Sequence, residues 1–257
     1  MNCMRVIPTL LLKGQGLVKT VEFANPQYVG DPINAVRIFN EKEVDEVSIL
    51  DILASRESRE PNFSLLAQIA EEAFMPLSYG GGITKVEHAR EIFRIGFEKI
   101  VLNTMAFENP DLVRKIAQKW GRQSVVVSID VRKSFWGSYR VFVRGRTKNT
   151  GEDPVAFAKK VEEYGAGEIL LNSIDRDGTQ SGFAIDVIKA VSSAVRIPTI
   201  ALGGAGTLDD FRKAFRDGGA SAVAAGSFFV FHGKHRAVLI TYPTPGEIKN
   251  LQRQGAE

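Results

Sequence analysis

Short apolar runs alternate along the chain with longer stretches in which apolar residues recur every three to four positions. The runs are rich in Val, Ile and Leu, which indicates buried parallel strands, and the stretches between them are typical of helices with one buried face. Eight strands are expected: Arg5–Leu11, Glu46–Leu50, Pro76–Tyr79, Lys99–Asn103, Ser124–Asp130, Glu168–Asn172, Pro198–Leu202 and Ser221–Gly226. Repeated strand–helix units predict a parallel sheet covered by helices.

Helix starts are marked by capping residues. Asp31 and Asp153 are each followed by proline, which suits an N-cap and the first helical position. Thr84 with Glu87 has the spacing of a capping box. These signals place helices directly after the expected strands.

The two halves of the chain repeat these signals. Asp31 recurs as Asp153 at a separation of 122 residues, and Thr84 recurs as Thr207 at 123. A doubly wound sheet normally has its glycine-rich turn after the first strand, whereas here the glycine pairs follow the third and seventh strands. The sequence therefore predicts an α/β fold, a closed (β/α)8 TIM barrel built of two similar half-barrels, with its chemistry at the carboxyl ends of the strands.

Two segments depart from the repeat within this single predicted domain, residues 1–257. Residues 134–149 alternate aromatic and basic side chains around glycines and predict a hairpin inserted after the fifth strand. Residues 228–243 form an atypical apolar insertion before the last helix. A loop this apolar has to be buried against something: it covers the last helix, or it docks another protein.

Composition narrows the function classes. Apolar residues make up 44% of the chain and charged residues 25%, so a large core is available. The net charge of +3, with Lys and Arg spread along the chain, disfavours a nucleic-acid partner. The single cysteine, Cys3, excludes an internal disulfide, and without Cys or His clusters we expect no metal site and no cofactor. No apolar run reaches the ~18 residues of a membrane span and no signal peptide is apparent, so we expect a cytoplasmic protein without a membrane partner.

Two glycine pairs occupy equivalent places in the two halves, and each is matched one unit later by a small residue at a helix start. One pair is equally well explained as a turn, but two equivalent ones favour backbone N–H groups that bind phosphate. We expect a phosphorylated small molecule with two phosphate groups. The predicted binding positions are Gly81, Gly82, Asn103, Thr104, Gly203, Gly204, Gly226 and Ser227.

Carboxylates follow three of the expected strands. Asp130 ends the fifth strand, where it suits a general acid or base, or alternatively orders a loop. Asp177 and Gly178 lie on a glycine-bearing loop, where Asp177 binds ligand hydroxyls or forms a local turn. Asp51 is the counterpart at the end of the second strand.

Charges also stand at the opposite, amino-terminal ends of four strands. Arg5, Glu46, Lys99 and Glu168 each begin an apolar run, and their signs alternate. They predict a ring of ion pairs at the bottom of the barrel, which physical reasoning alone interprets as a plug of the core.

Motifs along the whole chain resemble the cyclase subunit of imidazole glycerol phosphate synthase, the HisF family. They are GDP at Gly30–Pro32, LDILAS at Leu50–Ser55, GGGI at Gly80–Ile83, DRDGT at Asp175–Thr179 and GGAGT at Gly203–Thr207. The resemblance implies a TIM barrel that binds a bisphosphate substrate across its mouth. It further implies a HisH-type glutaminase on the N-terminal barrel face, with ammonia passing through the barrel. The charged ring then becomes the ammonia gate.

One departure from the family is decisive for the predicted chemistry. The family pairs Asp130 with an aspartate at the end of the first strand, and here that position is Leu11. The pattern resembles a HisF-like branch associated with surface-polysaccharide (acetamidino sugar, lipopolysaccharide) biosynthesis, in which ammonia goes to a sugar amidotransferase. The alternatives are a functional cyclase of histidine biosynthesis and, less in keeping with the missing acid, a sugar-phosphate isomerase.

Overall fold

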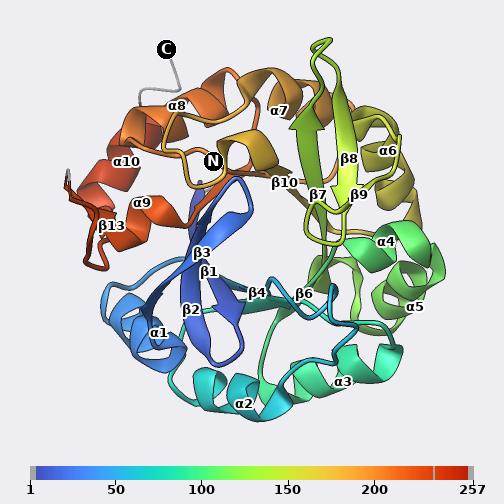
Figure 1. Cartoon of the computed structure of the whole chain (residues 1–257), viewed down its shortest axis with the longest axis horizontal. Helices are drawn as coiled ribbons and strands as arrows, with labels where there is room; N and C mark the ends of the chain where they lie inside the picture. The colour runs from blue at the N-terminus through green and yellow to red at the C-terminus, as the bar shows by residue number, and fades with distance from the viewer. Residues whose placement is uncertain (1–3, 234, 254–257) are drawn as a thin grey trace.

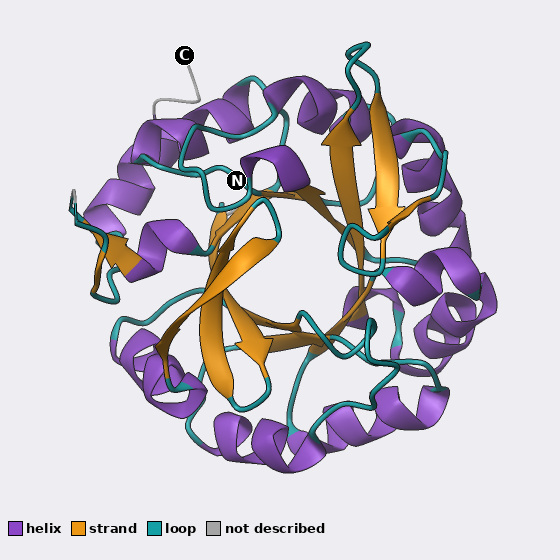
Figure 2. Ribbon diagram, viewed as in Figure 1, coloured by secondary structure: helices purple, strands orange, loops and turns teal. Residues whose placement is uncertain are grey.

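The computed structural model describes residues 4–233 and 235–253 and forms a closed barrel of eight parallel strands inside a ring of helices (Figures 1 and 2). Each strand pairs in parallel with the next, and the last closes onto the first. This confirms the predicted (β/α)8 fold. The strands are β1 (Arg5–Lys13), β4 (Val47–Asp51), β5 (Leu77–Gly80), β6 (Lys99–Leu102), β7 (Val125–Lys133), β10 (Glu168–Ser173), β11 (Thr199–Leu202) and β12 (Ala222–Ala225).

The helices pack their apolar faces against the outside of this barrel. They are α1 (Pro32–Glu41), α2 (Phe63–Glu71), α3 (Val86–Ile95), α4 (Thr104–Glu108), α5 (Pro110–Trp120), α6 (Pro154–Tyr164), α7 (Ile185–Ser192), α8 (Leu208–Arg216), α9 (Ser227–Val230) and α10 (Pro245–Arg253), with short 3-10 turns η1 (Arg122–Ser124) and η2 (Ile174–Arg176). Among the described residues, no helix has the length and apolar character needed to cross a membrane. Cys3 lies outside the described residues.

The predicted caps are confirmed at two helices and wrong at a third. The Asp31 side chain accepts the amide of Asn34 at the start of α1, and Asp153 caps α6 in the same way. The capping box predicted at Thr84 does not form, because α3 begins after Lys85 and the Thr84 amide donates to the His88 ring instead. Its repeat partner Thr207 does form a capping box, at the start of α8.

A hairpin that the strand pattern did not predict rises from the end of β1. It consists of β2 (Gly16–Val21), which pairs antiparallel with β1, and β3 (Ala24–Gly30), which pairs antiparallel with β2. In Figure 1 these blue strands cross the middle of the barrel. Lys19 and Thr20 of β2 are 4% and 5% exposed, so this hairpin carries polar side chains into the interior.

The segment at 134–149 continues β7 out of the barrel. β7 pairs antiparallel with β8 (Tyr139–Val143), which pairs with the short β9 (Lys148–Asn149). The turn between β7 and β8 presents Phe135 and Trp136 to solvent. In Figure 1 this hairpin projects past the ring of helices at the top of the view.

The apolar segment at 228–243 contains α9, a two-residue ribbon of β13 (Phe231–His232) and β14 (Ala237–Val238), and the connection to α10. Its Phe229 ring is 1% exposed. That ring contacts Phe39 of α1, Phe211 of α8 and Tyr242. Most of the segment's aromatic surface is therefore buried against the barrel's own helices.

Candidate functional site

A pocket opens at the carboxyl ends of the strands, and it brings together most of the residues that the sequence singled out. Eight of them line it: Gly81, Gly82, Asn103, Thr104, Asp130, Asp177, Gly226 and Ser227. Gly178, Gly203 and Gly204 are not in the lining. Gly203 lies beside it, because a Cβ at that position would contact the Asn172 side chain, which does line the pocket.

The two glycine-rich turns owe their shape to backbone conformations that favour glycine. Gly82 has φ +69° and Gly204 has φ +110°. A Cβ at Gly82 would collide with the carbonyl oxygen of Arg59, and one at Gly204 with that of Gly182. The turns therefore hold main chain close to neighbouring main chain, and only the turn of Gly81 and Gly82 faces the pocket directly.

Asp130 is a buried acid of the pocket whose pKa is strongly perturbed. It lies near the end of the barrel part of β7, is 7% exposed, and accepts hydrogen bonds from Ser128 Oγ (3.1 Å) and Asn103 Nδ2 (3.3 Å). Burial raises the pKa of Asp130 to about 7, against the opposing effect of the Ser128 hydrogen bond. A carboxyl with this pKa can give or take a proton at neutral pH.

Lys19 and Asp177 form a second polar group, on the wall that the β2–β3 hairpin supplies. Lys19 Nζ donates to the main-chain oxygen of Thr9 (2.6 Å), and Thr20 Oγ1 donates to Asp177 Oδ2 (2.8 Å). Burial lowers the pKa of Lys19 to about 8, although Asp177 partly offsets this. Burial also raises the pKa of Asp177. A Cβ at Gly226 would collide with Lys19 Nζ, so the amine lies directly over the predicted phosphate position.

Sequence reasoning missed Lys19 because it missed the strand that carries it. The available signal was a lysine inside the short apolar run Leu17–Val21, between two turn-forming stretches. A charged residue in a strand of that kind is buried only when it serves a partner or a ligand.

Two polar atoms of the lining have no hydrogen-bond partner among the described residues. They are Thr9 Oγ1 on β1 and Asn172 Oδ1 on β10. Asn172 is in register with Asp130 on the neighbouring β7. Buried polar atoms are nearly always hydrogen-bonded, so these two are available to a ligand or to water in the pocket.

The remaining carboxylates of the mouth have structural partners. Asp51 accepts the amides of Leu53 and Ala54 and pairs with Arg59 at 3.1 Å. The loop-ordering interpretation, which applied to any strand-end acid, therefore describes Asp51. Leu11 lines the pocket wall on β1, the strand next to the one that carries Asp51, and is paired in register with Leu50 of β4.

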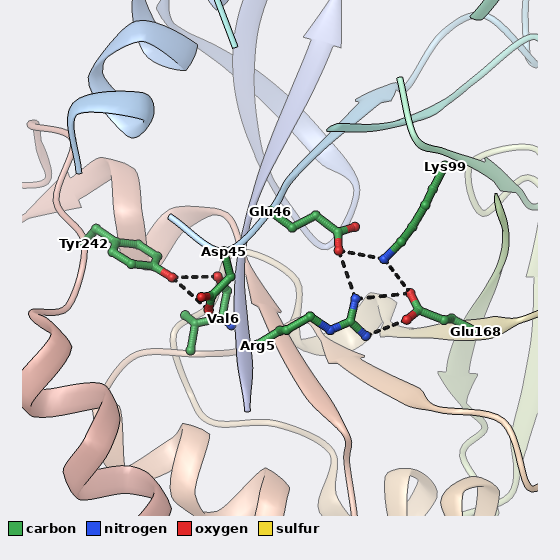
Figure 3. Close-up of polar contacts among 7 residues, drawn as sticks. All are labelled: Arg5, Val6, Asp45, Glu46, Lys99, Glu168 and Tyr242. Carbon is green, nitrogen blue, oxygen red and sulfur yellow. Dashed lines mark hydrogen bonds and ion pairs between the residues drawn. The ribbon is translucent and has the colours of Figure 1, made fainter. Parts of the chain in front are cut away.

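At the other end of the barrel the four predicted charges meet in a closed ring (Figure 3). Glu46 Oε2 accepts from Arg5 at 2.9 Å and from Lys99 at 2.7 Å. Glu168 also bridges both cations, with Arg5 at 2.5 Å and Lys99 at 3.1 Å. Only 4% of the Glu46 side chain and 12% of the Glu168 side chain are exposed, so the ring lies largely out of water.

A side chain of the apolar segment reaches the edge of this ring. Tyr242 Oη donates to the main-chain oxygen of Val6 (2.9 Å) and lies 3.3 Å from Asp45 Oδ2, next to Glu46 in the sequence (Figure 3). Asp45 in turn accepts the Val6 amide at 2.9 Å. The segment is thereby fastened to the starts of β1 and β4.

Beyond the ring the inward-facing side chains of the barrel are mostly apolar, although the buried Ser48 of β4 lies among them. Inward-facing side chains form a separate small cluster there: Ile7, Val101, Val126, Leu170, Ile200, Leu202, Ala222 and Ala224. Across residues 4–233 and 235–253, no three His, Cys, Asp or Glu side chains gather as a metal site. The axis of the barrel thus runs from buried ion pairs, through a mostly apolar layer, to a pocket that contains the buried acid Asp130.

A family model described as histidine biosynthesis protein matches residues 5–236. The chain belongs to this family. It is 58% identical over 239 residues to a Pseudomonas aeruginosa protein provisionally named as imidazole glycerol phosphate synthase subunit HisF2, covering 93% of this chain and 95% of that protein. It is 42% identical over 228 residues to the imidazole glycerol phosphate synthase subunit HisF of Alkaliphilus metalliredigens, covering 89% and 90%. A provisionally named HisF of Leptospira interrogans is 50% identical over 240 residues, with 93% and 94% covered. The chain is therefore a HisF-like member of the imidazole glycerol phosphate synthase family.

Proposed function

We propose that this HisF-like barrel passes ammonia from a HisH-type glutaminase, docked on its N-terminal face, to a sugar amidotransferase of surface-polysaccharide biosynthesis. Membership of the HisF family supports the first half of this route. The observation that carries the second half is Leu11, which lines the pocket at the place where the resemblance implies the cyclase aspartate. Leucine cannot transfer a proton, whereas the ring at the other end retains all four charges.

The interior of the barrel supports an ammonia path on physical grounds. Neutral ammonia is small and loses little solvation in an apolar layer, whereas an ammonium ion would lose most of its hydration energy. The layer between ring and pocket would therefore select the neutral molecule. The charged ring would serve as the gate. Its more mobile cation would be Lys99, because an ammonium group contacts both carboxylates through one nitrogen, whereas the planar guanidinium of Arg5 binds through two.

The pocket is proposed to bind a phosphorylated ligand. The turn of Gly81 and Gly82 and the helix starts at Thr104 and Ser227 contribute main-chain amides to the lining. The buried amine of Lys19 adds a positive charge close to Gly226. Together they provide a cationic and hydrogen-bonding surface for phosphate.

A second candidate function is cyclisation, as in histidine biosynthesis. Two observations favour it: the pKa of Asp130 lies near 7, and the unpartnered atoms of Thr9 and Asn172 face the pocket. Loss of one member of an acid–base pair typically reduces the rate ~100- to 10,000-fold, which is about 3 to 5 kcal/mol of barrier. The two proposed functions therefore predict cyclase turnover rates that differ by a measurable factor.

A steady-state cyclase assay with the family's bisphosphate substrate and ammonium salt distinguishes them. We expect turnover by the wild type to be at least ~100-fold slower than turnover by the Leu11→Asp variant. Leu11→Asn is the matched control, because it has nearly the same shape as aspartate but cannot transfer a proton, and it should stay as slow as the wild type. A wild type that turns the substrate over at a measurable rate, and as fast as Leu11→Asp, would establish the cyclase function.

The ammonia route has its own test. Mixing the barrel with a HisH-type glutaminase should form a complex and raise glutamine hydrolysis. If the purified subunits do not associate at micromolar concentrations, the conduit function is excluded.

A further inference from the structure

Two large aromatic side chains at the tip of the β7–β8 hairpin are almost completely exposed. Phe135 is 96% exposed and Trp136 is 90% exposed. Their rings pack on each other edge to face, with centroids 5.7 Å apart. Single exposed apolar residues are ordinary on a protein surface, but a paired Phe and Trp at a projecting tip is a feature of binding sites, where Trp and other aromatics supply most of the affinity.

The hairpin beneath this pair is held in place by its base. Asp175 accepts from Arg132 Nε (3.2 Å) and from the Lys133 amide (2.8 Å). Asp186 accepts from Lys133 Nζ and from the Tyr139 hydroxyl, both at 2.9 Å. The aromatic pair is therefore presented on a fixed support, which reduces the entropy lost on binding.

The hairpin is also strongly basic. Residues 131–151 include six Lys or Arg and no Asp or Glu. Arg140 and Arg146 make side-chain hydrogen bonds to main-chain oxygens, of Tyr139 and Glu22, and pair with no carboxylate among the described residues. The other four basic residues pair with carboxylates elsewhere in the barrel: Arg132, Lys133, Arg144 and Lys148. Arg140, on β8 opposite Arg132, therefore leaves positive charge near the aromatic tip, whereas Arg146 lies at the other end of the hairpin, next to the pocket-lining Gly145.

We infer that the Phe135–Trp136 tip docks the enzyme that accepts ammonia at the mouth, through an apolar pocket with an acidic rim on that enzyme. This rests on the proposed function. Phe135 lies in the turn that follows β7, two residues after the strand ends at Lys133 and five residues beyond Asp130 in the sequence, a chain length of at most about 17 Å. The tip projects past the ring of helices (Figure 1), so an acceptor enzyme seated on it would cover the point at which ammonia leaves the barrel by extending from the tip back over the mouth.

The charges of the mouth face favour a protein over an anionic membrane as the occupant. Exposed acids lie on the same face: the Glu57, Glu60 and Asp186 side chains are 50%, 61% and 56% exposed. A lipid surface flat against this face would meet these acids together with the basic hairpin, whereas a protein surface can match both signs. The two aromatic side chains can bury roughly 300 to 500 Å² in total, a large part of the about 800 Å² that one partner contributes to a specific interface.

Site-specific photocrosslinking in the native host tests the assignment. A benzophenone amino acid replaces Trp136 in the full chain, and in a second strain it replaces Phe74, which is 88% exposed on the connection that enters β5 at the N-terminal face. We expect the position-136 probe to crosslink an amidotransferase, identified by mass spectrometry, and the position-74 probe to crosslink the glutaminase. With that amidotransferase purified, Trp136→Ala should weaken binding at least ~10-fold, while Phe74→Ala leaves it unchanged.

The other outcomes are distinguishable. Crosslinks from position 136 to the glutaminase, to a second copy of this chain or to nothing, with position 74 reporting the glutaminase, overturn the docking assignment and leave the conduit function standing. Absence of the glutaminase from the position-74 crosslinks counts against the conduit function itself. Binding to phosphatidylglycerol vesicles, accompanied by a blue shift of Trp136 emission in a Trp120→Phe background, would assign the tip to a membrane and overturn the protein partner.

Discussion

Replacing Asp130 with asparagine should stabilise the protein, and by an amount that depends on pH. The carboxyl is 7% exposed and faces no cation within hydrogen-bond distance among the described residues, since its donors are Ser128 and Asn103. Burial raises its pKa from 3.8 to about 7. Asparagine keeps the shape of the side chain and removes the charge, so Asp130→Asn isolates the free-energy cost of the buried carboxylate.

The magnitude follows from the pKa shift. Below pH 3.8 the carboxyl is protonated in both the folded and the unfolded chain, and the shift costs nothing. As the pH rises from 3.8 to 7 the unfolded chain loses its proton first, so folding becomes less favourable, and above pH 7 the full cost is about 4 kcal/mol. At pH 5 it is about 1.6 kcal/mol. One mismatched hydrogen bond in the amide subtracts about 1 kcal/mol at every pH.

Urea unfolding of both proteins at pH 5, 6, 7 and 8 measures this difference. The free energy of unfolding of Asp130→Asn relative to wild type should rise by about 3 kcal/mol from pH 5 to pH 8, with the urea dependence unchanged. Asp51→Asn is the control: its carboxylate pairs with Arg59, so neutralising it should destabilise the protein by about 1 to 3 kcal/mol. A pH-independent difference for Asp130→Asn would refute the reasoning, because it would mean that water or a cation already solvates the carboxylate.

Three further changes have expected outcomes. Glu46→Gln leaves Arg5 and Lys99 sharing one carboxylate in a largely buried ring, and should lower the free energy of unfolding by about 3 to 5 kcal/mol in urea titrations. Lys19→Met removes an amine whose pKa burial lowers from 10.5 to about 8; below pH 8 the variant should be about 3 kcal/mol more stable, a gain that disappears as the pH rises to 10.5. Calorimetric titration with pyrophosphate should show affinity for the Lys19→Met variant reduced at least ~10-fold. Tyr242→Phe leaves the Val6 carbonyl without its hydroxyl donor and should lower the free energy of unfolding, measured by thermal denaturation, by about 1 to 3 kcal/mol. The ring of ion pairs should be unaffected.

The barrel strands were predictable, because each follows from a local pattern of apolar residues in the sequence. An apolar run of four to seven residues has few ways to be buried except as a strand, so all eight barrel strands coincide with predicted runs. The ring was predictable for the same reason: Arg5 and Lys99 begin apolar runs, and parallel strands bring their starts to one end. Side chains that alternate along β1 then place Arg5, Thr9 and Leu11 on the same inner face.

The features that depend on contacts between distant segments were not predictable. The buried amine of Lys19 reaches the pocket through the β2–β3 hairpin, whose apolar run Leu17–Val21 is short and is followed by the polar sequence of β3, so that its strand pairing depends on β1. The Thr84 cap failed because the His88 ring accepts the Thr84 amide, and the same ring nitrogen lies 3.2 Å from the main-chain oxygen of Gly82. In both cases a tertiary neighbour decides between two local structures of similar energy.

The charged groups at the two ends of the barrel affect stability in opposite ways, and this difference helps to interpret the leucine at position 11. The ring pairs every charge it buries, whereas the pocket keeps Asp130 and Lys19 buried at a combined cost of several kcal/mol. A protein rarely retains such a cost without a ligand that uses the groups. Leu11, on the strand that faces β7 across the barrel, adds no charge to this pocket, whereas a second carboxylate there would raise the pKa of Asp130 still further. The intact cation and acid therefore argue that the pocket still binds a ligand, even if Leu11 has removed one step of its chemistry. Leu11→Asp tests this directly, because a gain of cyclase activity requires that the remaining groups already be in place.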